Sequence, residues 1–275
     1  MSEPRTLAPF GRRLAPVTGN ETVGAYTVVS VEDGAGPPEP RPGQFYMLAA
    51  EREWGGHEGR PYLPRALSFC RSRPLAGDGA GGASLSFLLE QVGPGTRSLV
   101  ALQPPERVWL TGPLGVGFRP PSGRALLVGG GIGVAPMVCL HDELEPGGAR
   151  ALLGFRSAAH AQAARLFGSP PAVATDDGSS GRRALVTELL REELDRDAGV
   201  TVYACGPAVM LEAVRALCGE RGVRAQLALE SGMACGFGAC FGCVVATTKG
   251  YLRLCVDGPV VDADLLASAQ IAVAH

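Results

Sequence analysis

ESGMACGFGACFGC, residues 230–243, is the stretch on which the organisation of this 275-residue chain depends. Its three cysteines follow the spacing C-x4-C-x2-C, and Cys255 comes after eleven further residues. Glycines alternate with the cysteines, and glycine permits the positive-φ turns and close backbone approach that a small inorganic group needs. The stretch therefore predicts a tight wrap of backbone around four thiolates.

Cys235, Cys240, Cys243 and Cys255 match the ligand order of a plant-type [2Fe–2S] cluster, whose two irons need four thiolates. Structural zinc is an alternative, but zinc sites usually take their ligands from two short C-x2–4-C pairs, and this segment holds one. Disulfides are disfavoured because no secretory signal opens the chain. We therefore predict a [2Fe–2S] cluster held by these four residues.

Composition narrows the class of protein. A chain of this length exceeds one typical domain of roughly 100–200 residues, so two or three modules are expected. A formal net charge of -2 argues against nucleic-acid binding. The longest apolar run, residues 125–140, is shorter than a membrane span of ~20 residues. We expect a cytoplasmic protein without a membrane anchor, in which eight cysteines serve metal or redox chemistry.

The first part of the chain contains short β-type runs separated by turns rich in proline and glycine. Alternating or apolar runs occur at residues 22–31, 44–49, 66–70 and 84–90. The polar insert over residues 51–59 is expected to be a surface loop. Short strands with turn signals between them predict a small antiparallel sandwich or barrel.

Two places in this first part have residues suited to binding a cofactor. Arg65 and Ser68 lie on one short predicted strand, where they can hold a phosphate and a ring edge. Gly95 and Thr96 lie in a glycine-bearing turn at the start of a predicted short helix, where N–H groups and a hydroxyl can bind a diphosphate. Taken alone, an arginine on a strand is usually a solvated edge, and a glycine-bearing turn of this kind is usually an ordinary turn.

The middle of the chain has the pattern of an α/β sheet. Residues 125–128 form a continuous apolar run typical of a buried parallel strand. A glycine turn follows, with Gly129, Gly130, Gly131 and Gly133, and a helical pattern covers residues 137–144. Strand, glycine turn and helix is the arrangement that places a nucleotide phosphate at a helix N-terminus.

Further strands and helices alternate after this unit, which indicates a parallel sheet. The strands are predicted at residues 150–155, 172–175 and 200–204, and the helices at 158–167, 185–194 and 208–220. Cys205 ends the last of these strands, where ligands bind in parallel sheets; a buried core thiol is the alternative. Cys70, Cys139 and Cys218 lie on apolar faces and are predicted to be core residues. Near the C-terminus, strands are predicted at residues 244–247 and 251–256.

In this order the pieces resemble the electron-transfer subunit of the NAD-dependent dihydroorotate dehydrogenases, within the ferredoxin–NADP reductase superfamily. Arg65-Ala66-Leu67-Ser68 resembles the flavin motif R-P-x-S, with Ala66 in place of proline. Leu88-Leu89-Glu90 and Gly95-Thr96 fall where the family contacts the rest of FAD, and Leu89 and Glu90 replace tyrosine and arginine. The glycine turn and Cys205-Gly206-Pro207 resemble the pyridine-nucleotide motifs, and the cysteine segment is the most specific match.

The resemblance implies a multidomain fold and a set of cofactors. It implies an antiparallel β-barrel FAD domain over residues 1–119, an α/β parallel-sheet pyridine-nucleotide domain over 120–226 and a small [2Fe–2S] domain over 227–275. Cys205 takes the catalytic place beside the nicotinamide. Electrons from dihydroorotate, oxidised by a partner subunit that carries FMN, would pass through the cluster and FAD to NAD in pyrimidine biosynthesis. Two copies of each chain are expected in the assembly.

Two alternatives remain open from sequence. The same architecture serves as the small subunit of sulfide dehydrogenases and of NADH-dependent ferredoxin–NADP oxidoreductases. Arg156 leaves NAD and NADP undecided, because it can pair with a 2′-phosphate or with a nearby acid. Outside enzymes, a zinc-bound interaction module without flavin is the other candidate.

Overall fold

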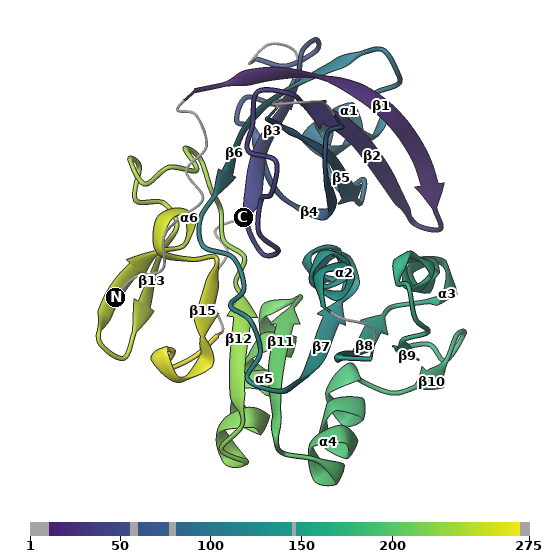
Figure 1. Cartoon of the computed structure of the whole chain (residues 1–275), viewed down its shortest axis with the longest axis vertical. Helices are drawn as coiled ribbons and strands as arrows, with labels where there is room; N and C mark the ends of the chain where they lie inside the picture. The colour runs from purple at the N-terminus through teal and green to yellow at the C-terminus, as the bar shows by residue number, and fades with distance from the viewer. Residues whose placement is uncertain (1–10, 56–59, 77–80, 145–146, 270–275) are drawn as a thin grey trace.

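The computed structural model describes residues 11–55, 60–76, 81–144 and 147–269. A closed antiparallel barrel occupies the first part, and its strands follow the order β1-β2-β5-β4-β3-β6 (Figure 1). The strands are β1 (Arg13–Val23), β2 (Tyr26–Asp33), β3 (Phe45–Ala50), β4 (Arg65–Pro74), β5 (Ala83–Leu89) and β6 (Arg107–Leu114), with the short helix α1 (Pro94–Val100) after β5. The predicted barrel is therefore confirmed.

Aromatic rings and one buried ion pair stabilise the barrel. Tyr46 contacts Phe69 and Phe87 edge to face, with ring centroids 6.0 and 5.8 Å apart. Arg13 donates from Nε and Nη2 to the two carboxylate oxygens of Asp33 at 2.8 and 2.6 Å. The side chains of this pair are only 11% and 2% exposed, so little solvent screens it.

The second part is a seven-stranded sheet of order β10-β9-β8-β7-β11-β12-β15, parallel except at β15. Its strands are β7 (Arg124–Gly130), β8 (Ala149–Phe155), β9 (Ala172–Thr175), β10 (Arg182–Arg183), β11 (Val200–Cys205), β12 (Arg224–Ala228) and β15 (Val260–Asp262). The connecting helices are α2 (Val134–Glu143), α3 (Ala158–Ala161), α4 (Val186–Arg196) and α5 (Ala208–Glu220), with 3-10 turns η1 (Gly131–Gly133) and η2 (Gln162–Leu166).

Helices cover both faces of this sheet because its central strands are apolar on both sides. On β7, Leu126 and Val128 belong to the hydrophobic cluster that contains residues of α4 and α5. Leu127, on the opposite face, belongs to the cluster that contains α2. Helix α2 lies between the sheet and the barrel (Figure 1), so it joins the two parts into one body.

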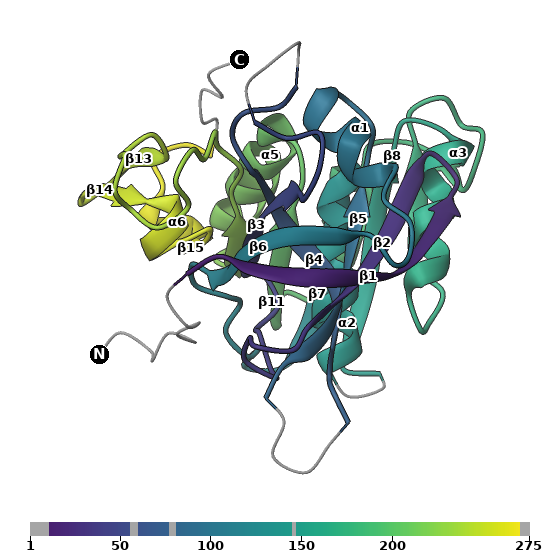
Figure 2. The same ribbon diagram turned by 90° about the horizontal axis from the view of Figure 1, so that it is seen from above.

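The cysteine segment lies at the edge of the sheet next to β12 (Figure 1), on the side of the molecule away from α3 (Figure 2). It contains the hairpin β13 (Val244–Thr247) and β14 (Gly250–Arg253), the short helix α6 (Leu254–Asp257) and, after β15, the turn η3 (Ala263–Leu265). β15 pairs antiparallel with β12, so this last part of the chain completes the central sheet. Leu229 N donates to Pro259 O at 2.9 Å, where the segment leaves and rejoins the sheet.

Several predicted elements are wrong or incomplete. The strand over residues 22–31 is two strands, because Gly24 (φ +61°) turns the chain into the hairpin of β1 and β2. The strand predicted over 251–256 ends at Arg253, and α6 begins at the next residue. The Asp257 carboxylate accepts a hydrogen bond from the Arg253 N–H at 3.0 Å across this short helix. The helix over 158–167 is α3 followed by η2, and the strands β6, β10, β12 and β15 have no counterpart among the predictions.

The remaining strand and helix predictions agree with the structure to within a few residues. The predicted loop over residues 51–59 falls partly on residues 56–59, outside the described part of the chain. Within the described ranges, no helix combines the length and apolar character that crossing a membrane would need.

Candidate active site between the barrel and the sheet

A cavity of about 290 Å³ lies where the barrel meets the carboxyl ends of the parallel strands. Its walls come from the barrel strands β3–β5 and the turn into α1, from the glycine turn after β7, from the end of β11 and from the residues after β12. They include Phe45, Ala66, Leu67, Ser68, Leu88, Leu89, Glu90, Thr96, Ile132, Gly133, Cys205, Glu230, Ser231, Met233 and Pro259. The cavity thus brings together residues from each of the motifs identified in the sequence.

The first flavin-type motif opens β4. Ala66, Leu67 and Ser68 line the cavity, whereas Arg65 does not. Arg65 Nη1 donates to Leu63 O at 2.6 Å, and its guanidinium lies so close to the start of α1 that a Cβ on Gly95 would be 2.7 Å from Arg65 Cζ. Arg65 and Gly95 therefore hold β4 against the turn into α1 beside the cavity.

The second motif ends β5. Leu88 and Leu89 are buried and form an apolar wall. Thr96 Oγ1 accepts hydrogen bonds from the N–H groups of Val92 (2.9 Å) and Gly93 (3.1 Å), so the hydroxyl caps its own turn. Glu90 points toward the α/β part, where its carboxylate pairs with Arg156.

The glycine turn passes directly behind Cys205. Gly131 has φ +54° and no heavy atom within 4 Å of where a Cβ would stand, so its outer side is open to a ligand. Gly130 and Gly133 are closely packed instead: a Cβ on Gly130 would meet Met210, and one on Gly133 would lie 2.5 Å from the carbonyl carbon of Cys205. Of the four predicted glycines, Gly133 lines the cavity, and Gly129 packs behind it.

Cys205 ends β11 and faces the cavity while remaining almost fully buried. Burial raises the pKa of its thiol well above the usual value, and the nearby Glu230 carboxylate raises it further. The thiol is therefore protonated at neutral pH. Such a group serves by contact and hydrogen bonding, because nucleophilic attack requires a thiolate.

Several cavity residues were not named as site residues from the sequence, and among them Glu230, Ser231 and Met233 open the cysteine segment. Glu230 is open to solvent inside the cavity but is crowded by protein atoms, and this desolvation raises the pKa of its carboxyl. Ser231 Oγ is buried and has no hydrogen-bond partner among the described residues. Their position just after β12, at the carboxyl end of a parallel strand, is the signal that could have identified them.

The four predicted ligands lie in two pairs. Cys243 Sγ and Cys255 Sγ are 3.2 Å apart, and Cys255 N donates to Cys243 Sγ at 3.4 Å. Cys240 N donates to Cys235 Sγ at 3.5 Å. Among the described residues, no three His, Cys, Asp or Glu side chains are grouped as they would be around one metal ion. Two cysteine pairs suit two irons better than a single zinc, which needs four ligands around one point.

Backbone N–H groups surround the sulfurs on the outer side of the segment. Burial alone would raise the pKa of Cys235, but hydrogen bonds from the N–H groups of Cys240 and Phe237 lower it to about 6. Burial and the neighbouring Cys243 raise the pKa of Cys255 to about 12. Gly236 and Gly238, at φ +79° and +90°, make the turns that aim these N–H groups inward.

The other predicted core cysteines are indeed core residues. Cys70, Cys139 and Cys218 are each at most 3% exposed. Burial raises the pKa of Cys70 and of Cys218 to about 12 and that of Cys139 well above its usual value. These thiols are protonated and take no part in the site.

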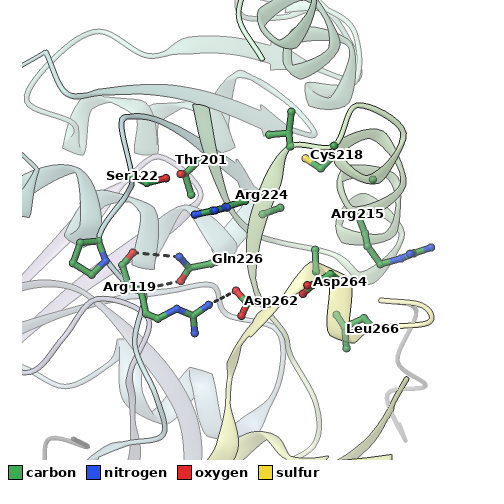
Figure 3. Close-up of a pocket in the computed structure, with 16 residues that line it drawn as sticks. Arg119, Ser122, Thr201, Arg215, Cys218, Arg224, Gln226, Asp262, Asp264 and Leu266 are labelled. Atoms are coloured by element: carbon green, nitrogen blue, oxygen red, sulfur yellow. Dashed lines mark hydrogen bonds and ion pairs between the residues drawn. The ribbon is translucent and has the colours of Figure 1, made fainter. Parts of the chain in front are cut away.

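A larger cavity, of about 810 Å³, lies at the other end of β11 and β12, beside Thr201 and Arg224 (Figure 3). Two polar groups in it already have partners: Arg119 pairs with Asp262, and Gln226 accepts from Arg119 N at 2.9 Å. It lies at the amino ends of the strands, whereas parallel sheets bind ligands at the carboxyl ends. Size alone therefore does not make it the active site.

A barrel joined to a parallel sheet, with a cavity between them and a four-cysteine segment beside it, defines a flavin- and pyridine-nucleotide-dependent oxidoreductase with an iron–sulfur cluster. Residues 230–267 match the family model of the iron–sulfur cluster binding domain of dihydroorotate dehydrogenase B. The chain is 36% identical over 245 residues to a dihydroorotate dehydrogenase B (NAD(+)) electron transfer subunit from Clostridium acetobutylicum, covering 86% of this chain and 92% of that one. A relative of the same name from Geobacillus kaustophilus is 38% identical and covers 80% of this chain and 84% of its own. The chain belongs to the family of dihydroorotate dehydrogenase B electron transfer subunits.

Solved structures share the fold. The NADH-dependent reduced ferredoxin–NADP oxidoreductase superposes with a TM-score of 0.74 at 23% identity and covers 94% of this chain and 92% of that chain. The ferredoxin reductase of carbazole 1,9a-dioxygenase superposes with a TM-score of 0.60 at 22% identity, over 78% of this chain and 66% of that chain. At these identities the likeness concerns the architecture.

Proposed function

We propose that this chain collects electrons at its cysteine segment from a catalytic subunit that oxidises dihydroorotate and delivers them to NAD at the barrel–sheet cavity. The observation that carries the proposal is the convergence of three parts of the fold on one cavity. Ser68 comes from the barrel, Cys205 from the sheet and Met233 from the start of the cysteine segment. The segments 1–119, 120–226 and 227–275 would then serve FAD, NAD and the cluster, respectively.

The flavin ring of FAD suits this cavity. Bound flavin accepts or donates two electrons as hydride and also exchanges single electrons, so it couples a nicotinamide to a one-electron cluster. Leu67, Leu88 and Leu89 give the cavity an apolar wall that excludes water from a ring bound there. The Ser231 hydroxyl, which has no hydrogen-bond partner in the described part of the chain, and the Ser68 side chain offer hydrogen bonds to the polar edge of such a ring.

The predicted FAD contacts at Arg65, Ala66, Glu90, Gly95 and Thr96 remain part of this proposal. Ala66 has no side chain that would obstruct a ring edge. Arg65 acts by fixing the turn into α1, since its guanidinium packs on Gly95. The backbone of this turn, with the N–H groups that Thr96 does not use, is the surface available to the rest of the cofactor.

NAD would approach along the glycine turn. The open side of Gly131 and the neighbouring Gly129 and Gly130 leave the backbone accessible to a diphosphate, and α2 begins immediately afterwards. Cys205 keeps its proton, so its neutral thiol positions the nicotinamide against the cavity by contact. Gly133 allows the glycine turn to approach the backbone of Cys205 closely.

Cys235, Cys240, Cys243 and Cys255 would ligate the [2Fe–2S] cluster, and the surface around them would face the catalytic subunit. Phe237 and Phe241 on this surface are 53% and 62% exposed, and large exposed aromatic side chains are typical of protein interfaces. Tyr251 on β14 is exposed as well. We further propose an assembly of two copies of each chain, with FMN in the partner, in the cytoplasm, where the eight thiols remain reduced.

Anaerobic purification followed by two assays tests the proposal. Flavin, iron and acid-labile sulfide are measured per chain, and NAD reduction is then followed with dihydroorotate after the candidate catalytic subunit is added. We expect one flavin and two irons per chain and a rate that needs both subunits. A colourless protein containing zinc would support the interaction module instead, and NAD reduction driven by sulfide without the second subunit would support the sulfide dehydrogenase alternative.

A further inference from the structure

One acid of the barrel reaches across to the α/β part beside the glycine turn. The Glu90 carboxylate, which follows β5, pairs with Arg156, which follows β8. His160 Nε2 lies 3.4 Å from the same carboxylate oxygen and 2.8 Å from Arg156 Nη2. These three side chains form a cluster at the boundary between the two parts, which we term the Glu90 cluster.

Arg156 lies where the Glu90 cluster can contact the adenosine end of a bound dinucleotide. β8 is the parallel neighbour of β7, and Gly130 pairs in register with Gly154 two residues before Arg156. In such sheets the side chain at the end of the second strand meets the adenosine ribose: an acid binds the 2′-hydroxyl, whereas an arginine accommodates a 2′-phosphate. Arg156 is therefore the cation placed to read a 2′-phosphate, and Glu90 already holds it.

Two further acids lie beside Arg156. Asp176 N donates to Phe155 O at 3.0 Å, and Asp177 N donates to Arg156 O at 3.4 Å, so the turn after β9 runs alongside this arginine. Asp177 accepts hydrogen bonds from Ser179 N and Oγ, which lower the pKa of its carboxyl and keep it ionised. The turn after β9 therefore brings the ionised Asp177 near Arg156, and the Arg183 side chain, which packs against Gly178 of the same turn, adds a positive charge there.

The acid side of the pair is fixed and the arginine side is exposed. Glu90 is 24% exposed and His160 17%, whereas Arg156 is 67% exposed. His160 is itself held by Ser157, with Oγ and Nδ1 3.0 Å apart, and by Tyr26, whose ring meets it edge-on at 5.5 Å. The Glu90 carboxylate is thus a preorganised partner, from which an incoming anion must detach Arg156.

We propose that Glu90 determines the preference of this chain for the unphosphorylated dinucleotide by occupying Arg156. A 2′-phosphate carries a charge of about −1.5 to −2, and it would have to displace the Glu90 carboxylate from Arg156 and then stand beside Glu90 and the ionised Asp177. A ribose hydroxyl carries no charge and meets no such repulsion. The inference rests on the proposed function, because it concerns the same dinucleotide.

The test measures binding rather than turnover. Isothermal titration calorimetry on the full-length, flavin-loaded protein gives the affinities for adenosine 2′,5′-bisphosphate and for 5′-AMP, and their ratio is the readout. We expect Glu90→Gln to shift this ratio toward the bisphosphate about tenfold, or ~1.4 kcal/mol. Glu21→Gln is the matched control, since it removes a carboxylate from the Glu21–Arg165 pair (2.8 Å), which also joins barrel and α/β part. It should leave the ratio unchanged.

Arg156→Gln makes the test independent of how well the Glu90 variant folds. In the wild-type background it should change bisphosphate affinity less than about twofold, because Arg156 is already occupied, and in the Glu90→Gln background it should abolish the tenfold gain. A ratio that does not respond to Glu90→Gln, or a large loss of bisphosphate affinity from Arg156→Gln alone, overturns the proposal. Either result leaves reduction of the flavin by NADH intact, whereas a wild-type protein that NADH cannot reduce refutes the proposed function itself.

Discussion

Replacing Gly133 with alanine should push the glycine turn away from the end of β11. A Cβ at this position would lie 2.5 Å from the carbonyl carbon of Cys205 and 2.6 Å from the amide nitrogen of Gly206, where ordinary contact begins at 3.4 Å. Two backbone segments would have to separate by about 0.9 Å in a close-packed interior. Overpacking of this kind costs about 1–3 kcal/mol.

Two measurements follow the change at Gly133. Urea unfolding gives the loss of stability, and NADH-dependent ferricyanide reduction gives KM and kcat. A displacement near 1 Å in a positioning element can cost up to about a hundredfold in rate, so we expect kcat/KM for NADH to fall at least about tenfold while flavin content is retained.

The control for this change is Gly168→Ala. Its new methyl group would find only His141 Cε1 within 4 Å, at 3.8 Å, so stability should stay within about 0.5 kcal/mol of the wild type. If Gly133→Ala kept both the wild-type stability and the wild-type KM, the close approach of the glycine turn to Cys205 would be refuted.

Three further predictions concern the cluster ligands, the barrel and helix α5. Cys255→Ser should lower iron and acid-labile sulfide per chain, whereas Cys218→Ser, in the core, should leave both unchanged; the reverse pattern would show that the fourth ligand is misassigned. Asp33→Asn should cost about 3–5 kcal/mol in urea unfolding, because it removes the negative charge from a buried ion pair, and a cost below about 1 kcal/mol would contradict a buried pair. The hydrogen bond from Arg215 lowers the pKa of Glu212 to about 2 from 4.5, so its contribution is complete above pH 4.5 and is lost as the pH falls toward 2. At about 1 kcal/mol after solvent screening, this pH dependence should disappear in Glu212→Gln.

Local patterns were sufficient for much of the fold. Alternating runs predicted the barrel, because a strand buried on one face alternates apolar and polar residues. The apolar run before the glycine turn predicted β7, because a strand buried on both faces is apolar throughout. The cysteine spacing predicted the four thiolates that the structure brings into two pairs. Each of these signals lies within a single stretch of chain.

Elements that depend on distant partners were missed. β6 contains Gly112 and Pro113, which read as a turn, and it is a strand because it pairs with β1 and β3. β12 reads RAQLA and lacks β-branched residues; its place between β11 and β15 makes it a strand.

The same holds for the site: residues in local motifs could be predicted from the sequence, and residues brought in by distant parts of the fold could not. Ser68 and Cys205 could be named from their motifs, but Glu230 and Ser231 are part of the cavity only because the sheet closes beside the barrel. The partner of Arg156 was left open between a phosphate and an acid. The acid is Glu90, which lies 66 positions earlier in the chain, and sequence spacing carries no information about that contact.

The hydrogen bond between Leu229 and Pro259 joins the two ends of the cysteine segment, so the segment is a self-contained insert in the sheet. Residues 230–258 leave the sheet and return to it at neighbouring points, so both ends of the insert are anchored to the same edge. Exchanging the insert for a short reverse turn would keep β12 and β15 paired but would remove Glu230, Ser231 and Met233 from the cavity wall together with the metal relay. An electron outlet can thus be added to such a scaffold, or removed from it, without rearranging the strands that hold the nucleotides.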